Sequence, residues 1–270
     1  MIDIGVNLTP KLFHKKHASS PEVGLTEFVA QCRSEGLSAM IAIGTSVKES
    51  LRAILHARQY PGYIFATAGV HPHDAQHLDA EGKKELEQLI HLPEVVAVGE
   101  MGLDFNRNFS PPDVQESVFA YQLDLNRAVN KPLYLHERDA TSRQIEIMQA
   151  HRSCFTSGVM HCFTGDKDRL RLYLDLGLHI GITGWVCDER RGMELVEAVR
   201  YIPADRLLAE TDSPYLLPRT LRPRPKHGQN QPWYVREVIR RIAEIQDVSV
   251  DEMLAVTRSN AKALFNLNID

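Results

Sequence analysis

The sequence predicts a closed (β/α)₈ TIM barrel, and two observations carry this prediction. Short apolar stretches typical of buried parallel strands alternate eight times with stretches of helical periodicity along the 270 residues. Eight strand–helix units in a chain of about 250 residues is the usual content of such a barrel. An open doubly wound sheet is the structural alternative. No GxGxxG motif follows the first strand, however, so its dinucleotide-binding form loses its main support.

The predicted strands span 2–7, 38–43, 63–70, 95–100, 132–136, 158–163, 178–183 and 206–212. The predicted helices between them span 25–35, 46–59, 81–91, 111–129, 141–150, 167–176 and 194–200. Ser46 followed by Glu49 is a capping-box pattern, and Gly177 is a natural helix end. A Pro- and Arg-rich loop, 213–231, then leads to two closing helices within about 233–265. We expect these helices to pack on the barrel, so that 1–270 forms one domain.

The composition is that of an ordinary globular protein, with 43% hydrophobic and 24% charged residues. No apolar run approaches the ~18 residues of a membrane span, and the start of the chain lacks the features of a secretory signal. The four cysteines show no CxxC spacing. We therefore expect a cytoplasmic protein with no membrane partner. Without a heptad repeat or a long apolar stripe, we expect a monomer.

The fourth predicted strand runs directly into a carboxylate. Residues 95–98 are small or β-branched, and Glu100 follows between Gly99 and Gly102. An ionised carboxylate beside a dry core is costly unless a cation or a hydrogen-bond donor accompanies it. Glycine permits tight turns and close approach of the backbone to a ligand. The pattern therefore indicates a functional position at this strand end.

Polar side chains recur where the other predicted strands end, which is where barrel enzymes carry their chemistry. The set is Asn7, Thr45, His71, Glu100, His136, His161, Thr183 and Asp212. A lone histidine or aspartate at such a place is most often a hydrogen-bonded core residue or a helix cap. Four metal-ligand residues from four different strands together predict a divalent ion: Glu100, His136, His161 and Asp212. Such an ion would lower the pKa of a bound water. Cys162 follows His161 and so points to the other face, which favours a catalytic ion over a structural zinc.

Five motifs occur in order: GVHPHD at 69–74, GEMGLDF at 99–105, LHERDA at 135–140, MHCFTG at 160–165 and ETDSPYL at 210–216. With them the chain resembles the TatD family of metal-dependent deoxyribonucleases, within the wider amidohydrolase-like barrels. The resemblance spans nearly the whole chain. It implies a metal-dependent hydrolase that cleaves phosphodiester bonds of single-stranded DNA from a 3′ end, with RNA as a further candidate substrate.

One departure from the family pattern lies in the first strand, where most members carry His-x-His and this chain has Gly5 and Asn7. In the usual two-metal arrangement those histidines belong to one ion, and the glutamate and two later histidines hold the other. The resemblance therefore implies one firm ion held by Glu100, His136 and His161, and a weak or absent second ion. We expect Mg²⁺, with Mn²⁺ and Zn²⁺ as alternatives.

For catalysis we expect Asp212 to act as general base. His71 and His73 would position the phosphate or protonate the leaving oxygen, unless they only order their loop. The alternatives to a nuclease are a small-molecule amidohydrolase on the same metal site and a barrel that binds nucleic acid without catalysis.

The predicted substrate contacts are basic or amide side chains near the strand ends. Asn7 and Arg138 follow strands, and Arg219 and Arg222 lie in the 213–231 loop with Arg224, Lys226 and His227. A basic rim on a chain of net charge −4 would attract single-stranded nucleic acid in a salt-sensitive way. Trp185 and Tyr215 would stack on unpaired bases or, alternatively, belong to the core.

Overall fold

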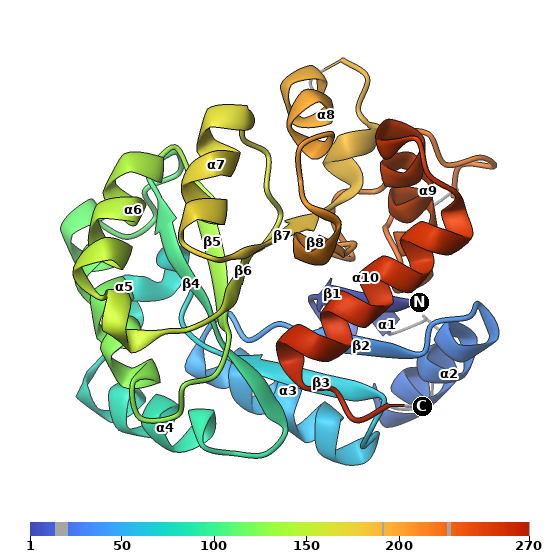
Figure 1. The fold of residues 1–270 in the computed structure, drawn as a ribbon. Coiled ribbons are helices and arrows are strands. Elements are labelled where there is room, and N and C mark those ends of the chain that lie inside the picture. Colours follow the sequence, from blue (N-terminus) through green and yellow to red (C-terminus); the bar gives the residue numbers. More distant parts are fainter. Residues whose placement is uncertain (14–20, 191, 226–227, 270) are drawn as a thin grey trace.

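A computed structural model describes residues 1–13, 21–190, 192–225 and 228–269 of the chain. Lys226 and His227, two of the predicted basic loop residues, lie outside the described residues. Within the described part, the eight predicted strands form one parallel sheet in chain order (Figure 1). The strands are β1 Ile2–Val6, β2 Ala39–Ala42, β3 Ile64–Ala68, β4 Val95–Asp104, β5 Leu133–Arg138, β6 Gly158–Met160, β7 His179–Ile182 and β8 Leu207–Ala209.

The barrel is nearly closed between β1 and β8. Two backbone hydrogen bonds of 2.9 Å join their ends, from the Asp212 amide to the Gly5 carbonyl and from the Asn7 amide to the Ser213 carbonyl. An isolated parallel bridge between Val6 and Ser213 accompanies them. The predicted TIM barrel is therefore confirmed, and its closure brings the two ends of the barrel sequence together at the carboxyl ends of the strands.

Helices cover the outside of the sheet (Figure 1). They are α1 Pro10–Phe13, α2 Pro21–Ser34, α3 Val47–Gln59, α4 Ala80–Ile90, α5 Pro112–Asn126, α6 Thr141–Ala150, α7 Lys167–Asp175, α8 Met193–Val199, α9 Val235–Gln246 and α10 Val250–Phe265. The short 3₁₀ helices are η1 Pro72–His77, η2 Arg152–Cys154, η3 Gly184–Cys187, η4 Ala204–Arg206 and η5 Pro232–Tyr234. The Ser46 side chain caps α3 by accepting from the Glu49 amide, as predicted. No helix among the described residues is long and apolar enough to span a membrane.

The amino end of the barrel is closed by α10, which lies across β1 and β8 (red in Figure 1). Its Ala261, Leu264 and Phe265 belong to the same buried cluster as Ile2 and Ile4 and other residues of the strands. The side chain of Asn260 donates to the carbonyls of Ala204 and Leu207 at the start of β8. Because this end is plugged by apolar side chains, a functional cavity has to open at the other end.

Two glycines let β4 approach β5 closely. Gly99 and Gly102 have φ angles of 140° and 145°. A Cβ atom on Gly99 would lie 2.1 Å from the Tyr134 carbonyl oxygen, and one on Gly102 would lie 1.9 Å from that of His136. The register between β4 and β5 shifts between Gly99 and Met101. Such irregularities re-aim side chains, and Glu100 sits within this one. The sequence predicted that these glycines allow a close approach of the backbone. The structure shows that the group approached is the backbone of the neighbouring strand, β5.

Candidate metal and nucleic-acid site

A cavity of about 830 Å³ opens at the carboxyl ends of the strands. The predicted residues that line it are Asn7, His71, His73, Glu100, His136, Arg138, His161 and Asp212. They come from β4 and β5 and from the segments that follow β1, β3, β6 and β8. The convergence expected at one mouth of the barrel is therefore present in the structure.

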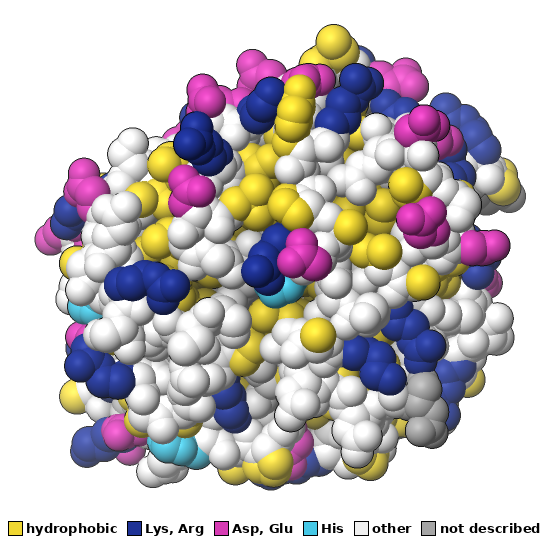
Figure 2. Space-filling model, in the orientation of Figure 1, with side chains coloured by type: hydrophobic (Ala, Val, Ile, Leu, Met, Phe, Trp, Pro, Cys, Tyr) yellow, Lys and Arg dark blue, Asp and Glu magenta, His cyan; other side chains and the backbone are white. Residues whose placement is uncertain are grey.

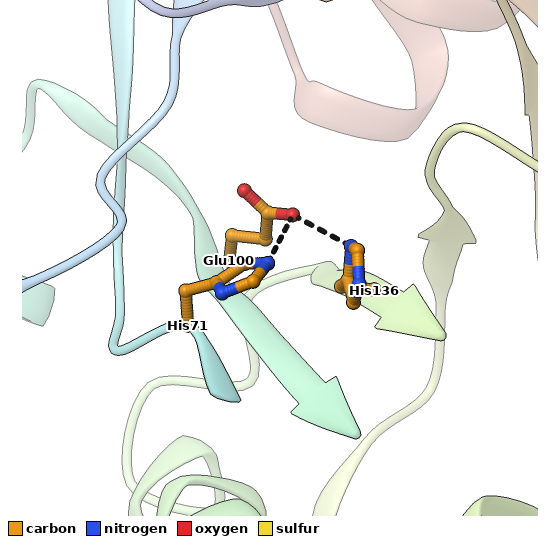
Figure 3. Close-up of side chains that lie close together, drawn as sticks. All are labelled: His71, Glu100 and His136. Atoms are coloured by element: carbon orange, nitrogen blue, oxygen red, sulfur yellow. Dashed lines mark ion pairs between the residues drawn. The ribbon is translucent and has the colours of Figure 1, made fainter. Parts of the chain in front are cut away.

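Glu100 is the centre of this group. Its Oε1 lies 3.1 Å from Nδ1 of His136, 3.5 Å from Nε2 of His71 and 3.6 Å from Nε2 of His161. Figure 3 shows the first two imidazoles pointing at the same carboxylate oxygen. Three buried or half-buried nitrogen donors thus face one carboxylate oxygen, an arrangement that a divalent cation can use.

The hydrogen bonds of His71 decide which of its nitrogens carries the proton. Its Nδ1 accepts from the His73 backbone amide at 3.1 Å. Burial lowers the pKa of His71 to about 3, so the ring is neutral. A neutral ring whose Nδ1 accepts must carry its proton on Nε2, the atom that faces Glu100. Although its distance from Glu100 would suit a metal ligand, His71 is therefore set up as a hydrogen-bond donor into the cavity.

His161 has the opposite arrangement. Its Nδ1 lies 2.8 Å from Oε2 of Glu210, and the Tyr134 hydroxyl donates to the same oxygen at 2.9 Å. The other oxygen of Glu210 accepts from the Cys162 backbone amide at 2.6 Å. Because Nδ1 donates to Glu210, a cation that replaces the proton on Nε2 would leave His161 a neutral ring whose Nε2 lone pair faces Glu100. Carboxylates orient metal-binding histidines in this way.

His136 and His73 share a second carboxylate, Asp104. Nε2 of His73 lies 2.7 Å from Oδ2 of Asp104, and Nε2 of His136 lies 3.7 Å from the same oxygen. The Nε2 atom of His136 is buried and has no hydrogen-bond partner among the described residues. The rings of His73 and Phe109 also meet edge to face. Asp104 thus anchors His73 and lies beyond the outer edge of His136.

The carboxylates of this cluster favour positive charge on the groups around them. Burial alone would raise the pKa of Glu100, but His71, His161 and His136 hold it well below its ordinary value. Burial would lower the pKa of His161, but Glu210 and Glu100 raise it to about 10. The corresponding value for His136 is about 8, because Asp104 and Glu100 outweigh its burial. Either protons on the histidines or a divalent cation can neutralise the negative charge of these carboxylates. The residues present therefore fit a metal ion.

Asp212 lies next to this cluster and is held by Asn7. Nδ2 of Asn7 donates to Oδ1 of Asp212 at 2.7 Å. Burial raises the pKa of Asp212 to about 7, against the opposing effect of His161. Ligand atoms of His161, Cys162 and Asp212 lie within 4.8 Å of one another, as do those of His71, Glu100 and His136, so two groups at this cavity could hold a cation. Cys162 lines the cavity, so the prediction that it points to the other face is wrong. Asn7, predicted as a substrate contact, is therefore also the partner of the predicted base.

Gly5 stands where the family resemblance predicts a histidine, and the space beside it is occupied. A Cβ atom on Gly5 would lie 2.5 Å from Oε2 of Glu210 and 2.8 Å from the Tyr134 hydroxyl. The space beside Gly5 is therefore filled by the two groups that hold His161. Gly5 supports the histidine at the end of β6 without contributing a ligand of its own.

The predicted arginines divide into two groups. Arg138 lines the cavity together with Arg107 and Arg169. Arg219 instead lies 3.8 Å from Asp188, and the guanidinium of Arg222 donates to carbonyls of its own loop. Neither of these two lines the cavity. On the face drawn in Figure 2, which includes α10, basic side chains are interspersed with acidic and neutral ones.

Three further residues in or next to the motifs have roles that were not predicted: Asp104, Tyr134 and Glu210. Side chains two apart on a strand share a face, so Asp104 follows Glu100, and Tyr134 precedes His136, on the cavity side. That periodicity could have identified both. Glu210 precedes Asp212 by the same spacing, but its contact with His161 depends on the closure of the barrel.

Comparisons with known proteins support the resemblance to the TatD family. The family model described as "TatD related DNase" matches residues 2–266. A protein named 3′-5′ ssDNA/RNA exonuclease TatD from Rahnella sp. (strain Y9602) is 45% identical over 268 residues, covering 99% of both chains. Its namesake from Edwardsiella piscicida is 46% identical over 267 residues, covering 99% of this chain and 100% of its own. A TatD-family hydrolase structure from Entamoeba histolytica has a TM-score of 0.85 at 26% identity, covering 98% of this chain and 97% of its own.

The match is as long as the chain itself, and the motifs that it contains supply the side chains around Glu100. This chain belongs to the TatD-related DNase family.

Proposed function

We propose that the protein is a metal-dependent 3′-5′ exonuclease that hydrolyses phosphodiester bonds of single-stranded DNA and RNA. The observation that carries the proposal is the convergence of His136 and His161 on one oxygen of Glu100, at the base of a cavity lined by arginines. The name shared by the full-length relatives supports the substrate class and the polarity.

Glu100, His136 and His161 would hold one divalent cation. The hydrogen-bonding pattern favours these three over a set that includes His71, because the proton of His71 lies on the nitrogen facing Glu100. Mg²⁺ is the proposed ion, although two imidazole ligands also suit Mn²⁺ and Zn²⁺. When bound, the ion supplies a coordinated water of lowered pKa and polarises a phosphoryl oxygen. The replacement of the first-strand histidines by Gly5 and Asn7 argues for a weak or absent second ion.

The residues around the metal position would accept a proton and bind the phosphates. Asp212, oriented by Asn7, accepts the proton of the attacking water. His71 directs its Nε2–H at a phosphoryl oxygen, which fixes the scissile phosphate. Arg138 contributes a fixed positive charge for the phosphates of the bound strand. His73 is held by Asp104, so we propose that it orders the loop that presents His71.

The test is digestion of a single-stranded oligonucleotide labelled at either end, with Mg²⁺, Mn²⁺ or Zn²⁺ added in turn to metal-stripped protein. We expect release of mononucleotides from the 3′ end only after an ion is added. Glu100→Gln should abolish release, whereas Arg222→Gln, which does not line the cavity, should retain it. Hydrolysis without added ion, or full activity of Glu100→Gln, would overturn the proposal. Hydrolysis of cyclic amides or lactones in place of the oligonucleotide would support the amidohydrolase alternative.

A further inference from the structure

A second, smaller cavity adjoins the main one. Its volume is about 160 Å³, and it lies beyond the ends of β1 and β2, beside α3. Asn7, Thr45 and Tyr215 line both cavities, so the two are contiguous. Asn7 also bonds Asp212. The small cavity therefore begins where the proposed reaction centre ends.

The small cavity has both apolar and polar walls. Ala42, Ile43 and Ala53 are buried and form an apolar floor. Thr45 and Glu49 supply polar groups. A flat ligand with apolar faces and a polar edge matches such a lining, and a nucleobase is a ligand of this kind.

Tyr215 forms the remaining wall. Its side chain is 59% exposed, although it is large and aromatic. Its backbone amide donates to the Asp212 backbone carbonyl at 2.9 Å, which fixes the two residues' backbones next to each other. An exposed aromatic ring in a site for single strands is typical of base stacking. Of the two alternatives that the sequence left for Tyr215, its exposure excludes the core.

We infer that this cavity, here called the base pocket, binds the nucleobase of the strand's terminal nucleotide, with Tyr215 stacked on its face. The inference rests on the proposed nuclease function. Buried side chains close the floor, so a base can enter the pocket but the backbone cannot pass through it. A base held there leaves its own phosphate toward Asn7 and Asp212, so the pocket would select the terminal bond for cleavage.

The test compares two otherwise identical oligonucleotides, one with a normal 3′ nucleotide and one with an abasic 3′ end. Binding is measured in EDTA by fluorescence anisotropy, and hydrolysis is measured separately with Mg²⁺. The wild-type protein should bind the normal end about tenfold more tightly, since stacking of one base is worth that much or more. Tyr215→Ala and Ala53→Leu, which fills the pocket, should bind both ends equally. Tyr215→Phe should keep the preference.

The abasic strand is the internal control, because neither Tyr215→Ala nor Ala53→Leu should weaken its binding. Equal binding of both ends by the wild-type protein would overturn the base pocket, as would a preference that survives in both variants. Failure of the proposed function has a different signature. In that case a base-dependent preference in EDTA would accompany a lack of hydrolysis with every ion, which supports the pocket and rejects the nuclease.

Discussion

His161 and Glu210 form a fully buried pair in which Nδ1 of the imidazole lies 2.8 Å from Oε2 of the carboxylate. The pair fixes the ring so that Nε2 faces Glu100, and Tyr134 and the Cys162 amide hold the carboxylate in turn. The second carboxylate, Glu210, is thus a positioning residue for a candidate metal ligand.

Both oxygens of Glu210 accept hydrogen bonds, and glutamine has only one acceptor oxygen and no negative charge. Glu210→Gln should therefore weaken Mn²⁺ binding by about 10–100-fold. Isothermal titration calorimetry on metal-stripped protein measures this affinity. Tyr134→Phe removes only one donor to Glu210 and should cost less than about tenfold. Unchanged affinity in Glu210→Gln would show that the pair does not orient the ligand.

Asp212→Asn should reduce kcat by about a hundredfold or more, because the amide cannot accept a proton, while Mn²⁺ affinity stays within a few-fold. Single-turnover digestion and calorimetry on the same protein separate the two effects. Asn7→Ala removes the hydrogen bond to Asp212 but leaves the carboxylate, so its loss of kcat should be smaller. If Asp212→Asn loses its metal instead, Asp212 is a ligand and the assignment as base is wrong.

The barrel could be predicted because each strand is a short apolar run with a polar end. Most of the polar residues at the predicted strand ends, including Glu100, His136 and His161, proved to line the cavity. What the sequence could not give was the pairing across the barrel. Glu210 meets His161 only because β6 and β8 converge on the cavity, and nothing local distinguishes Glu210 from a helix cap.

The basic loop shows a second limit of the sequence. Prolines and arginines predicted a rim over the site, but Arg219 pairs with Asp188 and Arg222 folds onto its own loop. Arg169, by contrast, reaches the cavity from the first turn of α7. Which way a long charged side chain points depends on its neighbours in space, and composition does not specify them.

This division among the arginines predicts different salt responses. Arg138→Gln should lower the slope of log Kd against log salt by about 0.7 for single-stranded DNA, as expected for one lost phosphate contact. Arg222→Gln is the matched control and should leave the slope unchanged. The slopes come from anisotropy titrations at several salt concentrations. Equal slopes for wild type and Arg138→Gln, or a change confined to Arg222→Gln, would place the phosphate contacts elsewhere.

Asp3 links stability to pH. It is fully buried and accepts from the Gly5 and Thr211 amides and from the Thr211 hydroxyl. Burial nevertheless raises its pKa to about 8. Between the ordinary value near 4 and this value, the native state retains a proton that the unfolded state has lost. The contribution of Asp3 to stability should therefore fall as pH rises from about 4 to about 8.

Asp3→Asn mimics the protonated acid and should remove this pH dependence, at a cost within about 1 kcal/mol at pH 5. Asp3→Ala leaves buried donors unpaired and should cost about 2 kcal/mol or more. Urea unfolding at pH 5, 6.5 and 8 measures all three proteins. A wild-type stability that rises relative to Asp3→Asn over this range would contradict a protonated Asp3.

One cation should bind between Glu100, His136 and His161, and anomalous diffraction from a crystal soaked in Mn²⁺ would locate it. We expect a peak contacted by Glu100 Oε1, His136 Nδ1 and His161 Nε2, which disappears in Glu100→Gln. A fully active protein whose only manganese peak lies away from these three atoms would contradict it.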